Sequence, residues 1–387
     1  MTVTVTPRKI KGRIRARASK SYAQRIIIAS AFCHGPTRIE NFDLSKDINA
    51  SLSAVNSLGA KTLINDNILT VFPIEKKNDS VFINSGECGT TARIILPCAC
   101  ALYKEGILSG EGSLLSRPFE DLVNCLTEKG VEFSSSSLPI KFRADMQEGV
   151  YKLNPAKSSQ FLSGLLFALP LLEKPTSIEL TSDISSVGYV DMTRKVLSRF
   201  GIKSYLYYDG SEEYISPEEI EIEGDASNSA FFSACGIKVD GVPKDSLQKD
   251  IIFDTIKDDL YIDAKDIPDL VPILSVYATT KEKDTTIGNI NRLRLKESDR
   301  IESIVDMITA LGGEIKATEN EITIHGSKGL RGGIVNSHND HRIVMSSVIA
   351  SQFCTSDVTI TGAEAVEKSY PQFFSDFVSL GGEIYVK

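Results

Sequence analysis

One pattern of polar and hydrophobic residues occurs six times along the chain. Each copy begins with a short polar stretch and continues into a run of small and apolar residues long enough for a buried helix. The six copies lie at 19–32, 88–102, 158–172, 225–237, 267–279 and 339–353. Successive copies start about 70 residues apart, except that the fourth and fifth are closer, and such a period indicates an internal repeat.

The residues after each of these helices also follow a common pattern. A turn and a β-like stretch come first, and most copies then have an amphipathic segment that ends at glycine, as in 47–61 and 298–315. Glycine just after the last periodic residue is a signal for the end of a helix. We therefore predict an α/β (α+β) protein of repeated units, in which the first helix of each unit is buried and the second is partly exposed.

The repeat also predicts how the chain divides into domains. A chain of 387 residues is too long for one ordinary core, and six units divide naturally into two domains of three. The segment 242–266 contains no clear amphipathic helix with a terminal glycine, so we expect the fourth unit to be truncated. We predict one domain over 14–223 and a second over 224–387 together with 1–13.

Composition and charge exclude several classes of protein. No run reaches the ~20 apolar residues that cross a bilayer, so we expect no membrane association. The net charge of −8 argues against a general nucleic-acid binder, whose affinity rests on a basic surface. The basic N-terminus lacks the apolar core of a secretory signal. The alternation of Ile10, Ile14 and Ala16 with basic residues instead predicts a half-buried strand.

Cysteine and histidine usage points to a reducing compartment. The seven cysteines include no CxxC pair, and the four histidines are scattered, so disulfides and a metal site are poor interpretations. We expect buried thiols in a cytoplasmic protein that holds no metal. No exposed apolar stripe requires a partner, and we therefore expect a monomer.

Charged and polar residues gather where the buried helices begin. Lys20 and Ser21 open the first helix with Arg25 one turn later, and the N–H groups of a helix N-terminus combined with such side chains suit an anion. Gly86 and Gly89 precede the second helix and would let the backbone approach a ligand closely. Exposed basic residues and an ordinary glycine turn are the alternatives for these two segments.

Three further segments carry candidate chemistry. Arg117 follows a glycine-containing loop that could close over a site. The third helix starts with Ser158, Ser159 and Gln160, which could cradle a phosphate, although capping alone would explain either serine. At the fifth helix, Asp269 could take a proton from a substrate hydroxyl.

The densest group of charges extends from Arg292 to Arg300. Such a run is usually a solvated surface. Here it follows an apolar strand pattern and precedes an apolar helix pattern, which places it at a strand-to-helix junction. Arg342 and Lys368 lie at similar junctions in the last unit. A repeat that brings these junctions into one cleft predicts a site for several phosphates and carboxylates.

Taken in order, these motifs resemble the enolpyruvyl transferase family, and within it the branch that uses shikimate 3-phosphate. The matching segments read SKSxxxR, GTxxR, RP, SSQFL, SxxxYxD, GDAS, IPD, KExDR, NDHR and KSYP. The resemblance implies a two-domain inside-out α/β barrel of six βαβαββ repeats, with the fourth truncated here. It also implies that the enolpyruvyl group of phosphoenolpyruvate is transferred to the 5-hydroxyl of shikimate 3-phosphate, with release of phosphate, in aromatic amino-acid (chorismate) biosynthesis. No metal or organic cofactor takes part.

The resemblance implies the site residues as well. The phosphoenolpyruvate side would comprise Lys20, Gly89, Arg117, Gln160, Arg300, Arg342 and Lys368. The shikimate 3-phosphate side would comprise Ser21, Arg25, Ser158, Ser159, Gln160, Ser186, Tyr189, Asp269 and Lys296. The catalytic residues would be Lys20, Asp269, Glu297 and Lys368. Asp269 or Glu297 would take the proton of the hydroxyl, and Lys20 or Lys368 would be the cationic proton donor. Arg93 would support the glycine loop.

Two alternatives stay open. The sister branch that uses a UDP-amino sugar (UDP-N-acetylglucosamine) usually has asparagine where this chain has Ser21, and a reactive cysteine in the loop that here spans 106–118 without one. A non-catalytic anion-binding relative is the other alternative, supported by the short fourth unit and by Glu87, where the family often has asparagine. The resemblance further implies that glyphosate competes with phosphoenolpyruvate, and we expect Glu87 to weaken its binding.

Overall fold

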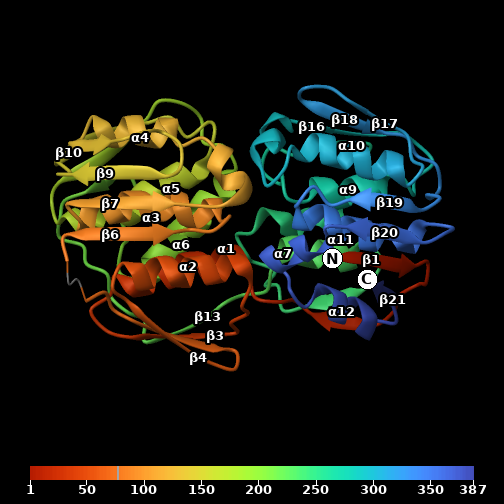
Figure 1. Cartoon of the computed structure of the whole chain (residues 1–387), viewed down its shortest axis with the longest axis horizontal. Helices are drawn as coiled ribbons and strands as arrows, with labels where there is room; N and C mark the ends of the chain where they lie inside the picture. The colour runs from red at the N-terminus through yellow and green to blue at the C-terminus, as the bar shows by residue number, and fades with distance from the viewer. Residues whose placement is uncertain (76–77) are drawn as a thin grey trace. The chain divides into compact units, whose positions relative to one another are not determined.

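The computed structural model describes residues 1–75 and 78–387, which form two compact units (Figure 1). One unit comprises residues 18–223, and the other comprises residues 1–17 and 224–387. The chain therefore passes from one unit to the other after Arg17 and again after Glu223. Both units combine helices with mixed sheets, so the predicted α/β class is confirmed.

The helices of the unit 18–223 fall into two groups. Those that begin with a polar stretch are buried almost all round, as predicted, because nearly every residue on them is small or apolar; they are α1 (Lys20–Ala31), α3 (Gly89–Leu102) and α5 (Ser159–Ala168). The others bury one face and are amphipathic; they are α2 (Lys46–Ser57), α4 (Glu120–Thr127) and α6 (Val187–Arg199). Short 3-10 turns lie at η1 (Gly112–Ser116) and η2 (Leu169–Leu172).

Three sheets complete this unit. Their strands are β3 (Thr37–Glu40), β4 (Lys61–Asn65), β5 (Ile68–Phe72), β6 (Ser80–Asn84), β7 (Glu105–Ser109), β8 (Val131–Phe133), β9 (Ile140–Ala144), β10 (Gly149–Leu153), β11 (Thr176–Leu180), β12 (Tyr207–Tyr208) and β13 (Glu219–Glu221). The strand orders are β6-β7-β9-β8, β10-β11-β12 and β13-β3-β5-β4. Each sheet holds one parallel pair and an antiparallel extension. A parallel pair requires a crossover, and the buried helix α3 connects β6 to β7 in this way.

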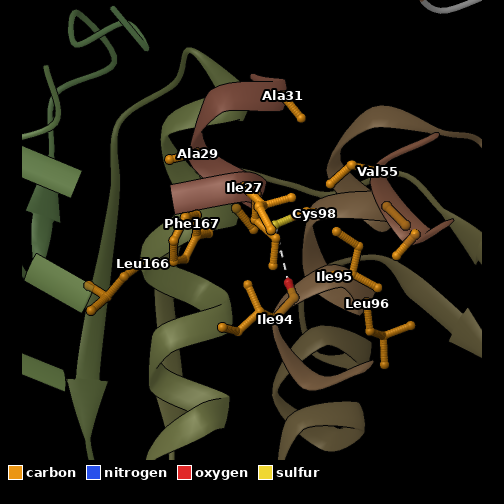
Figure 2. Packing of buried hydrophobic residues seen from close by; sticks show 14 of the residues in the cluster. Ile27, Ala29, Ala31, Val55, Ile94, Ile95, Leu96, Cys98, Leu166 and Phe167 are labelled. Carbon is orange, nitrogen blue, oxygen red and sulfur yellow. Dashed lines mark hydrogen bonds between the residues drawn. The ribbon is translucent and has the colours of Figure 1, made fainter. Parts of the chain in front are cut away.

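The buried helices pack on one another to form the core of this unit. Figure 2 shows Phe167 of α5 beside Ile27 of α1, with Ile94 of α3 on the side of α3 that faces α5. Fully burying one such side chain contributes roughly 1.5 to 3 kcal/mol, so these contacts hold the polar starts of the helices in place.

The unit formed by 1–17 and 224–387 has the same two kinds of helix. Its buried helices are α7 (Ala226–Ser233), α9 (Val271–Ala278) and α11 (His341–Ala350). Its other helices are α8 (Phe253–Ile256), α10 (Arg300–Ala310) and α12 (Phe373–Ser379). The 3-10 turns are η3 (Lys249–Ile252), η4 (Asn291–Leu295), η5 (Ser351–Phe353) and η6 (Ala363–Lys368).

The sheets of this unit bring the two chain termini together. The strands are β1 (Thr2–Thr6), β2 (Arg13–Arg15), β14 (Lys238–Asp240), β15 (Tyr261–Asp263), β16 (Thr285–Gly288), β17 (Ile315–Ala317), β18 (Glu321–Ile324), β19 (Gly333–Asn336), β20 (Val358–Thr361) and β21 (Glu383–Val386). The strand orders are β19-β20-β1-β21, β15-β16-β18-β17 and β14-β2. Strand β1 lies between β20 and β21, and Thr2 and Lys387 exchange backbone hydrogen bonds of 3.2 and 2.8 Å (Figure 1).

One local prediction needs correction, and the predicted absence of a long amphipathic helix from 242–266 is confirmed. The half-buried N-terminal strand is shorter than expected, because Gly12 adopts a φ of +126° and β2 begins only at Arg13. The segment 242–266 contains η3 and the four-residue helix α8 in place of a long amphipathic helix. In the described part of the chain, no helix is long and apolar enough to cross a membrane. All seven cysteines carry free thiols, five of them buried.

Candidate functional site

In the unit 18–223, Lys20 is the first residue of α1 and forms a short ion pair. Its Nζ donates to Oδ2 of Asp47 at 2.7 Å, and the two side chains are only 15% and 13% exposed. Asp47 lies in the first turn of α2, two residues after the capping residue Ser45. Asp47 was not among the residues predicted from the sequence, although an acidic residue in the first turn of a helix is a recognisable signal. The pair holds a cation in a mostly buried position.

Gly89 and Arg117 lie against each other in the same unit. Gly89 begins α3, and Arg117 follows the turn η1. A Cβ atom placed on Gly89 would lie 2.8 Å from Nη1 of Arg117, so any larger side chain would displace the guanidinium. Arg117 is 8% exposed. The absence of a side chain at position 89 therefore allows an arginine to cover the start of this helix.

The amide of Gln160 is held by two neighbours on α3. Arg93 Nη1 donates to Gln160 Oε1 at 2.8 Å, and Gln160 Nε2 donates to Oγ1 of Thr90 at 2.7 Å. Arg93 also donates to the carbonyl oxygen of Pro118 at 3.1 Å. Arg93 thus connects Gln160 to the segment that carries Arg117.

Ser158 and Ser159 mark the start of α5. Ser158 is the capping residue, and its Oγ accepts a hydrogen bond from Gln160 N at 3.2 Å. Capping uses one lone pair of the hydroxyl, and its O–H group can still donate to an anion. Both serines are buried, so the polar start of the helix is preformed.

Arg25 is a buried connector between α1 and α6. Its side chain is 1% exposed and donates to Oγ1 of Thr193 and the carbonyl oxygen of Ser21, both at 2.8 Å, and to the carbonyl oxygen of Tyr189 at 3.3 Å. Burial lowers the pKa of Arg25 to about 10, because the charged form loses hydration. Arg25 thus brings together two other residues of the predicted set, Ser21 and Tyr189. Ser186 caps α6 in a left-handed conformation, with φ of 50°.

In the other unit, Arg300 is the centre of a group of buried charges. We call this group the Arg300 cluster; its members are Asp269, Lys296, Glu297, Arg300, Asp340 and Arg342. The Arg300 side chain is fully buried. Its Nε donates to Asp340 at 2.9 Å, its Nη1 donates to Asp269 at 2.9 Å, and its Nη2 donates to Glu297. Three carboxylates therefore surround one guanidinium, and the pKa of Arg300 lies above its usual value despite the opposing effect of burial, because Asp340, Glu297 and Asp269 attract its charge.

Asp269 is shared by three cations of this cluster. Its Oδ1 lies 2.9 Å from Arg300 Nη1 and 3.6 Å from Lys296 Nζ, and its Oδ2 lies 3.3 Å from Arg342 Nη2. Burial would raise the pKa of Asp269, but these cations hold that pKa well below its usual range. Burial lowers the pKa of Lys296. The cluster therefore combines a carboxylate that stays ionised with cations arranged around it.

Lys368 and Arg342 approach the same short segment. Lys368 ends η6 and donates from Nζ to the carbonyl oxygen of Asn339 at 2.8 Å. Asp340, the next residue, caps α11 by accepting from Arg342 N at 2.9 Å. Sequence analysis noted Asp340 in the NDHR motif but did not place it in the site. Its two contacts, with Arg300 and with the start of α11, make it a structural link between two predicted ligand-binding arginines.

The predicted residues divide between the two units. The unit 18–223 holds Lys20, Ser21, Arg25, Gly89, Arg117, Ser158, Ser159, Gln160, Ser186 and Tyr189. The other unit holds Asp269, Lys296, Glu297, Arg300, Arg342 and Lys368. Within the described residues, no group of three or more histidines, cysteines, aspartates and glutamates could hold a metal ion. Cations at helix N-termini bind phosphates and carboxylates, and ionised carboxylates beside them can move protons.

Each unit is mixed α/β, and buried helices of each begin beside cationic side chains. These features are typical of a class of protein that binds small, multiply charged anions. The model of the family described as EPSP synthase (3-phosphoshikimate 1-carboxyvinyltransferase) matches residues 5–259 and 257–377. The chain belongs to the EPSP synthase family.

Named relatives support this assignment, and a solved structure shares the fold. The 3-phosphoshikimate 1-carboxyvinyltransferase of Clostridium acetobutylicum is 36% identical over 419 aligned positions, covering 99% of this chain and 98% of the relative. The protein of the same name from Clostridium kluyveri is 35% identical with the same coverage. A solved structure of EPSP synthase from Acinetobacter baumannii covers both chains fully with a TM-score of 0.80 at 24% identity, which shows the shared fold.

Proposed function

We propose that this chain transfers the enolpyruvyl group of phosphoenolpyruvate to the 5-hydroxyl of shikimate 3-phosphate and releases phosphate. Family membership over almost the whole length supports the reaction. The observation that carries the proposal at the level of the site is the Arg300 cluster, because it places an ionised carboxylate, Asp269, among cations that suit an anionic substrate. The reaction would be one step of aromatic amino-acid biosynthesis.

We propose substrate-binding roles for residues of each unit. Phosphoenolpyruvate would be bound by Lys20, Gly89, Arg117, Gln160, Arg300, Arg342 and Lys368. Shikimate 3-phosphate would be bound by Ser21, Arg25, Ser158, Ser159, Gln160, Ser186, Tyr189, Asp269 and Lys296. Charged groups are seldom buried without partners. Several of the charged residues proposed here are buried, and they lie in linked clusters at the starts of helices. This burial of charge supports the assignment, because a preformed group of charges suits an anionic substrate.

Proton transfer would centre on Asp269, Glu297, Lys20 and Lys368. Without ligand, the cations around Asp269 lower its pKa and make it a weak base. A bound phosphate or carboxylate would share Arg342 and Lys296, loosen their hold on Asp269 and raise its basicity where the substrate hydroxyl must lose a proton. Lys20 or Lys368 would donate the proton that the methylene carbon of phosphoenolpyruvate gains. Loss of a methyl proton from the tetrahedral intermediate would then expel phosphate.

We further propose that the sheets belong to a two-domain inside-out α/β barrel of six βαβαββ repeats. The sheet orders β6-β7-β9-β8 and β15-β16-β18-β17 support this, because each has a parallel pair followed by two antiparallel strands. The two-stranded sheet β14-β2 would be the truncated fourth repeat. The two compact units would be the two domains. Seven free thiols fit an enzyme of the reducing cytoplasm. We propose that this enzyme is a monomer.

Phosphate release from phosphoenolpyruvate, measured with each of two acceptors, tests the proposed reaction. We expect release with shikimate 3-phosphate and none with UDP-N-acetylglucosamine. Release with the UDP-sugar alone would establish the sister activity, which the named relatives do not favour. A folded sample that releases no phosphate with either acceptor would identify a non-catalytic relative.

A further inference from the structure

The thiol of Cys88 lies at the centre of a buried hydrogen-bond network in the unit 18–223. Cys88 caps α3 immediately before Gly89, and its Sγ accepts from the backbone N of Thr91 at 3.5 Å and from Oγ1 of Thr91 at 3.1 Å. The amide Nε2 of Gln24, on α1, lies 2.8 Å from the same sulfur. One side chain thus connects the start of α3 to the helix that begins at Lys20.

The network continues from α3 to the ion pair of Lys20. Thr91 Oγ1 lies 2.6 Å from Oγ of Ser51, whose single hydroxyl proton can go to Thr91 or to the backbone oxygen of Asp47 at 3.2 Å. Asp47 in turn accepts from Lys20 Nζ at 2.7 Å. We call this group the Cys88 network; its members are Lys20, Gln24, Asp47, Ser51, Cys88 and Thr91. It closes a loop through α1, α2 and α3.

The side chains at the centre of the network are buried. Gln24, Ser51 and Thr91 have no exposed area, and Cys88 is 2% exposed. Burial, with a smaller contribution from the charge of Asp47, raises the pKa of Cys88 to about 11, so the group is a neutral thiol that can donate as well as accept. The Oε1 atom of Gln24 is buried and has no hydrogen-bond partner among the described residues, so its amide is held through Nε2 by Cys88 and Thr91.

We propose that Cys88 is a positioning residue for the phosphoenolpyruvate side of the site. Through Gln24 and Thr91 it fixes the start of α3, where Gly89 meets Arg117, relative to the start of α1, where Lys20 lies. This inference rests on the proposed function, because Lys20, Gly89 and Arg117 are the groups expected to contact phosphoenolpyruvate. Cys88 itself need not touch the substrate. Its effect would be on the positions of Lys20, Gly89 and Arg117 at the moment that phosphoenolpyruvate binds.

The inference predicts a selective kinetic change. Cys88→Ala removes the sulfur and leaves the Gln24 amide with its 3.5 Å contact to Thr91, so the helix starts lose their common anchor. A misplacement of 1 Å can cost a factor of ~10² in catalysis, and a smaller shift should raise the KM for phosphoenolpyruvate roughly threefold to tenfold. The KM for shikimate 3-phosphate should stay within about twofold, because Arg25 and Ser158 lie outside the network.

Steady-state kinetics of four proteins test this inference. The variants are Cys88→Ala, Cys88→Ser and Cys125→Ala, each compared with the unaltered enzyme for both KM values and kcat. Cys125, on α4, is a matched control because its thiol is also 2% exposed and belongs to the same unit but not to the network. We expect the serine variant to restore the phosphoenolpyruvate KM, since its hydroxyl can replace both roles of the thiol, and the Cys125 variant to leave it unchanged.

Two results would overturn the inference. One is an unchanged phosphoenolpyruvate KM in Cys88→Ala; the other is an equal rise for both substrates that Cys125→Ala reproduces. If Cys88→Ala does not fold, the double variant Gln24→Leu/Cys88→Ala removes both polar partners at little cost in stability. That variant should still show the raised KM, and a normal value would contradict the inference. An inactive unaltered enzyme would instead refute the proposed function.

Discussion

Arg300 donates from Nε to Oδ2 of Asp340 at 2.9 Å, and neither side chain has any exposed area. Asp340 also caps α11 by accepting from the backbone N of Arg342. One buried carboxylate therefore orients the guanidinium of one predicted ligand-binding arginine and the backbone of another. This relationship connects the stability of the unit formed by 1–17 and 224–387 to the geometry of the Arg300 cluster.

Replacing Arg300 should destabilise the protein strongly. Arg300→Met leaves Asp340, Asp269 and Glu297 without their shared cation, and breaking a buried ion pair costs about 3 to 5 kcal/mol. The matched control is Arg294→Met, which breaks exposed pairs that contribute about 0 to 1 kcal/mol. Urea unfolding at pH 7 measures both. Equal losses for the two variants would contradict the role given to Arg300.

The stability supplied by Asp269 should depend on acid pH. Its folded-state pKa is depressed, because the opposing cost of burial is outweighed by Arg342, Lys296 and Arg300. Its contribution is therefore present above the unfolded-state value of about 3.9 and is lost as pH falls towards the lower folded value. We expect Asp269→Asn to be less stable than the unaltered protein at pH 7, by about 3 kcal/mol.

Unfolding curves of Asp269→Asn and the unaltered protein between pH 2 and 7 test this dependence. The gap between them should narrow below about pH 4. A stability difference that widens as pH falls would contradict a folded-state pKa of Asp269 below its unfolded value. The substitution should also reduce kcat by a factor of ~10² to 10⁴ if this carboxylate is the general base.

Asp250 should show the opposite pH dependence. It is buried, accepts a hydrogen bond from Ser227, and has its pKa raised to about 7 by burial and by Asp269 and Asp225, against the opposing effects of the Ser227 hydrogen bond and Arg342. Because the folded-state pKa is raised, protonated Asp250 contributes to the free energy of unfolding. This contribution is fully present below the unfolded-state pKa of about 4 and is lost as pH rises through about 7.

Asp250→Asn removes the titration while an amide oxygen can still accept from Ser227. We expect this variant to gain stability relative to the unaltered protein between pH 5 and 8, with a slope approaching about 1.4 kcal/mol per pH unit below pH 7. Thermal or urea unfolding across that range measures the difference. A difference that does not change with pH would contradict a carboxyl group that is protonated in the folded state at pH 5.

Glu87 should reduce the affinity for glyphosate, which we expect to compete with phosphoenolpyruvate. Its carboxylate lies against the backbone of Gly112, since a Cβ placed on that glycine would be 2.6 Å from Oε2. Glu87→Asn removes one negative charge near the start of α3 and should lower the inhibition constant roughly threefold to tenfold. Glu111→Gln is the control, because this exposed carboxylate accepts a hydrogen bond from Asn84, the last residue of β6, and lies next to Gly112. An unchanged constant in Glu87→Asn would refute the effect.

The sequence predicted the buried helices well because their signals are local. The capping residues Ser158, Asp225 and Asp340 accept hydrogen bonds at the starts of α5, α7 and α11, and each precedes a run that is apolar almost all round. A cap followed by such a run specifies both where a helix begins and that it will be buried.

The charge clusters could not be read in the same way. Arg300 belongs to a charge run that would ordinarily face solvent, and its burial depends on Asp269 and Asp340, which are distant in sequence. Asp47 was missed because its partner Lys20 lies on another helix. The N-terminal strand was placed too early because alternation cannot reveal that Gly12 breaks the extended backbone.

The most direct test of the account is to follow product and phosphate together. Purified protein is given phosphoenolpyruvate and shikimate 3-phosphate, the enolpyruvyl ether is quantified by mass spectrometry, and phosphate is measured in the same samples. We predict equal amounts of ether and phosphate, and a loss of both in Asp269→Asn. Phosphate without the ether, or ether formation that Asp269→Asn leaves unchanged, would contradict the reaction or the role of the Arg300 cluster.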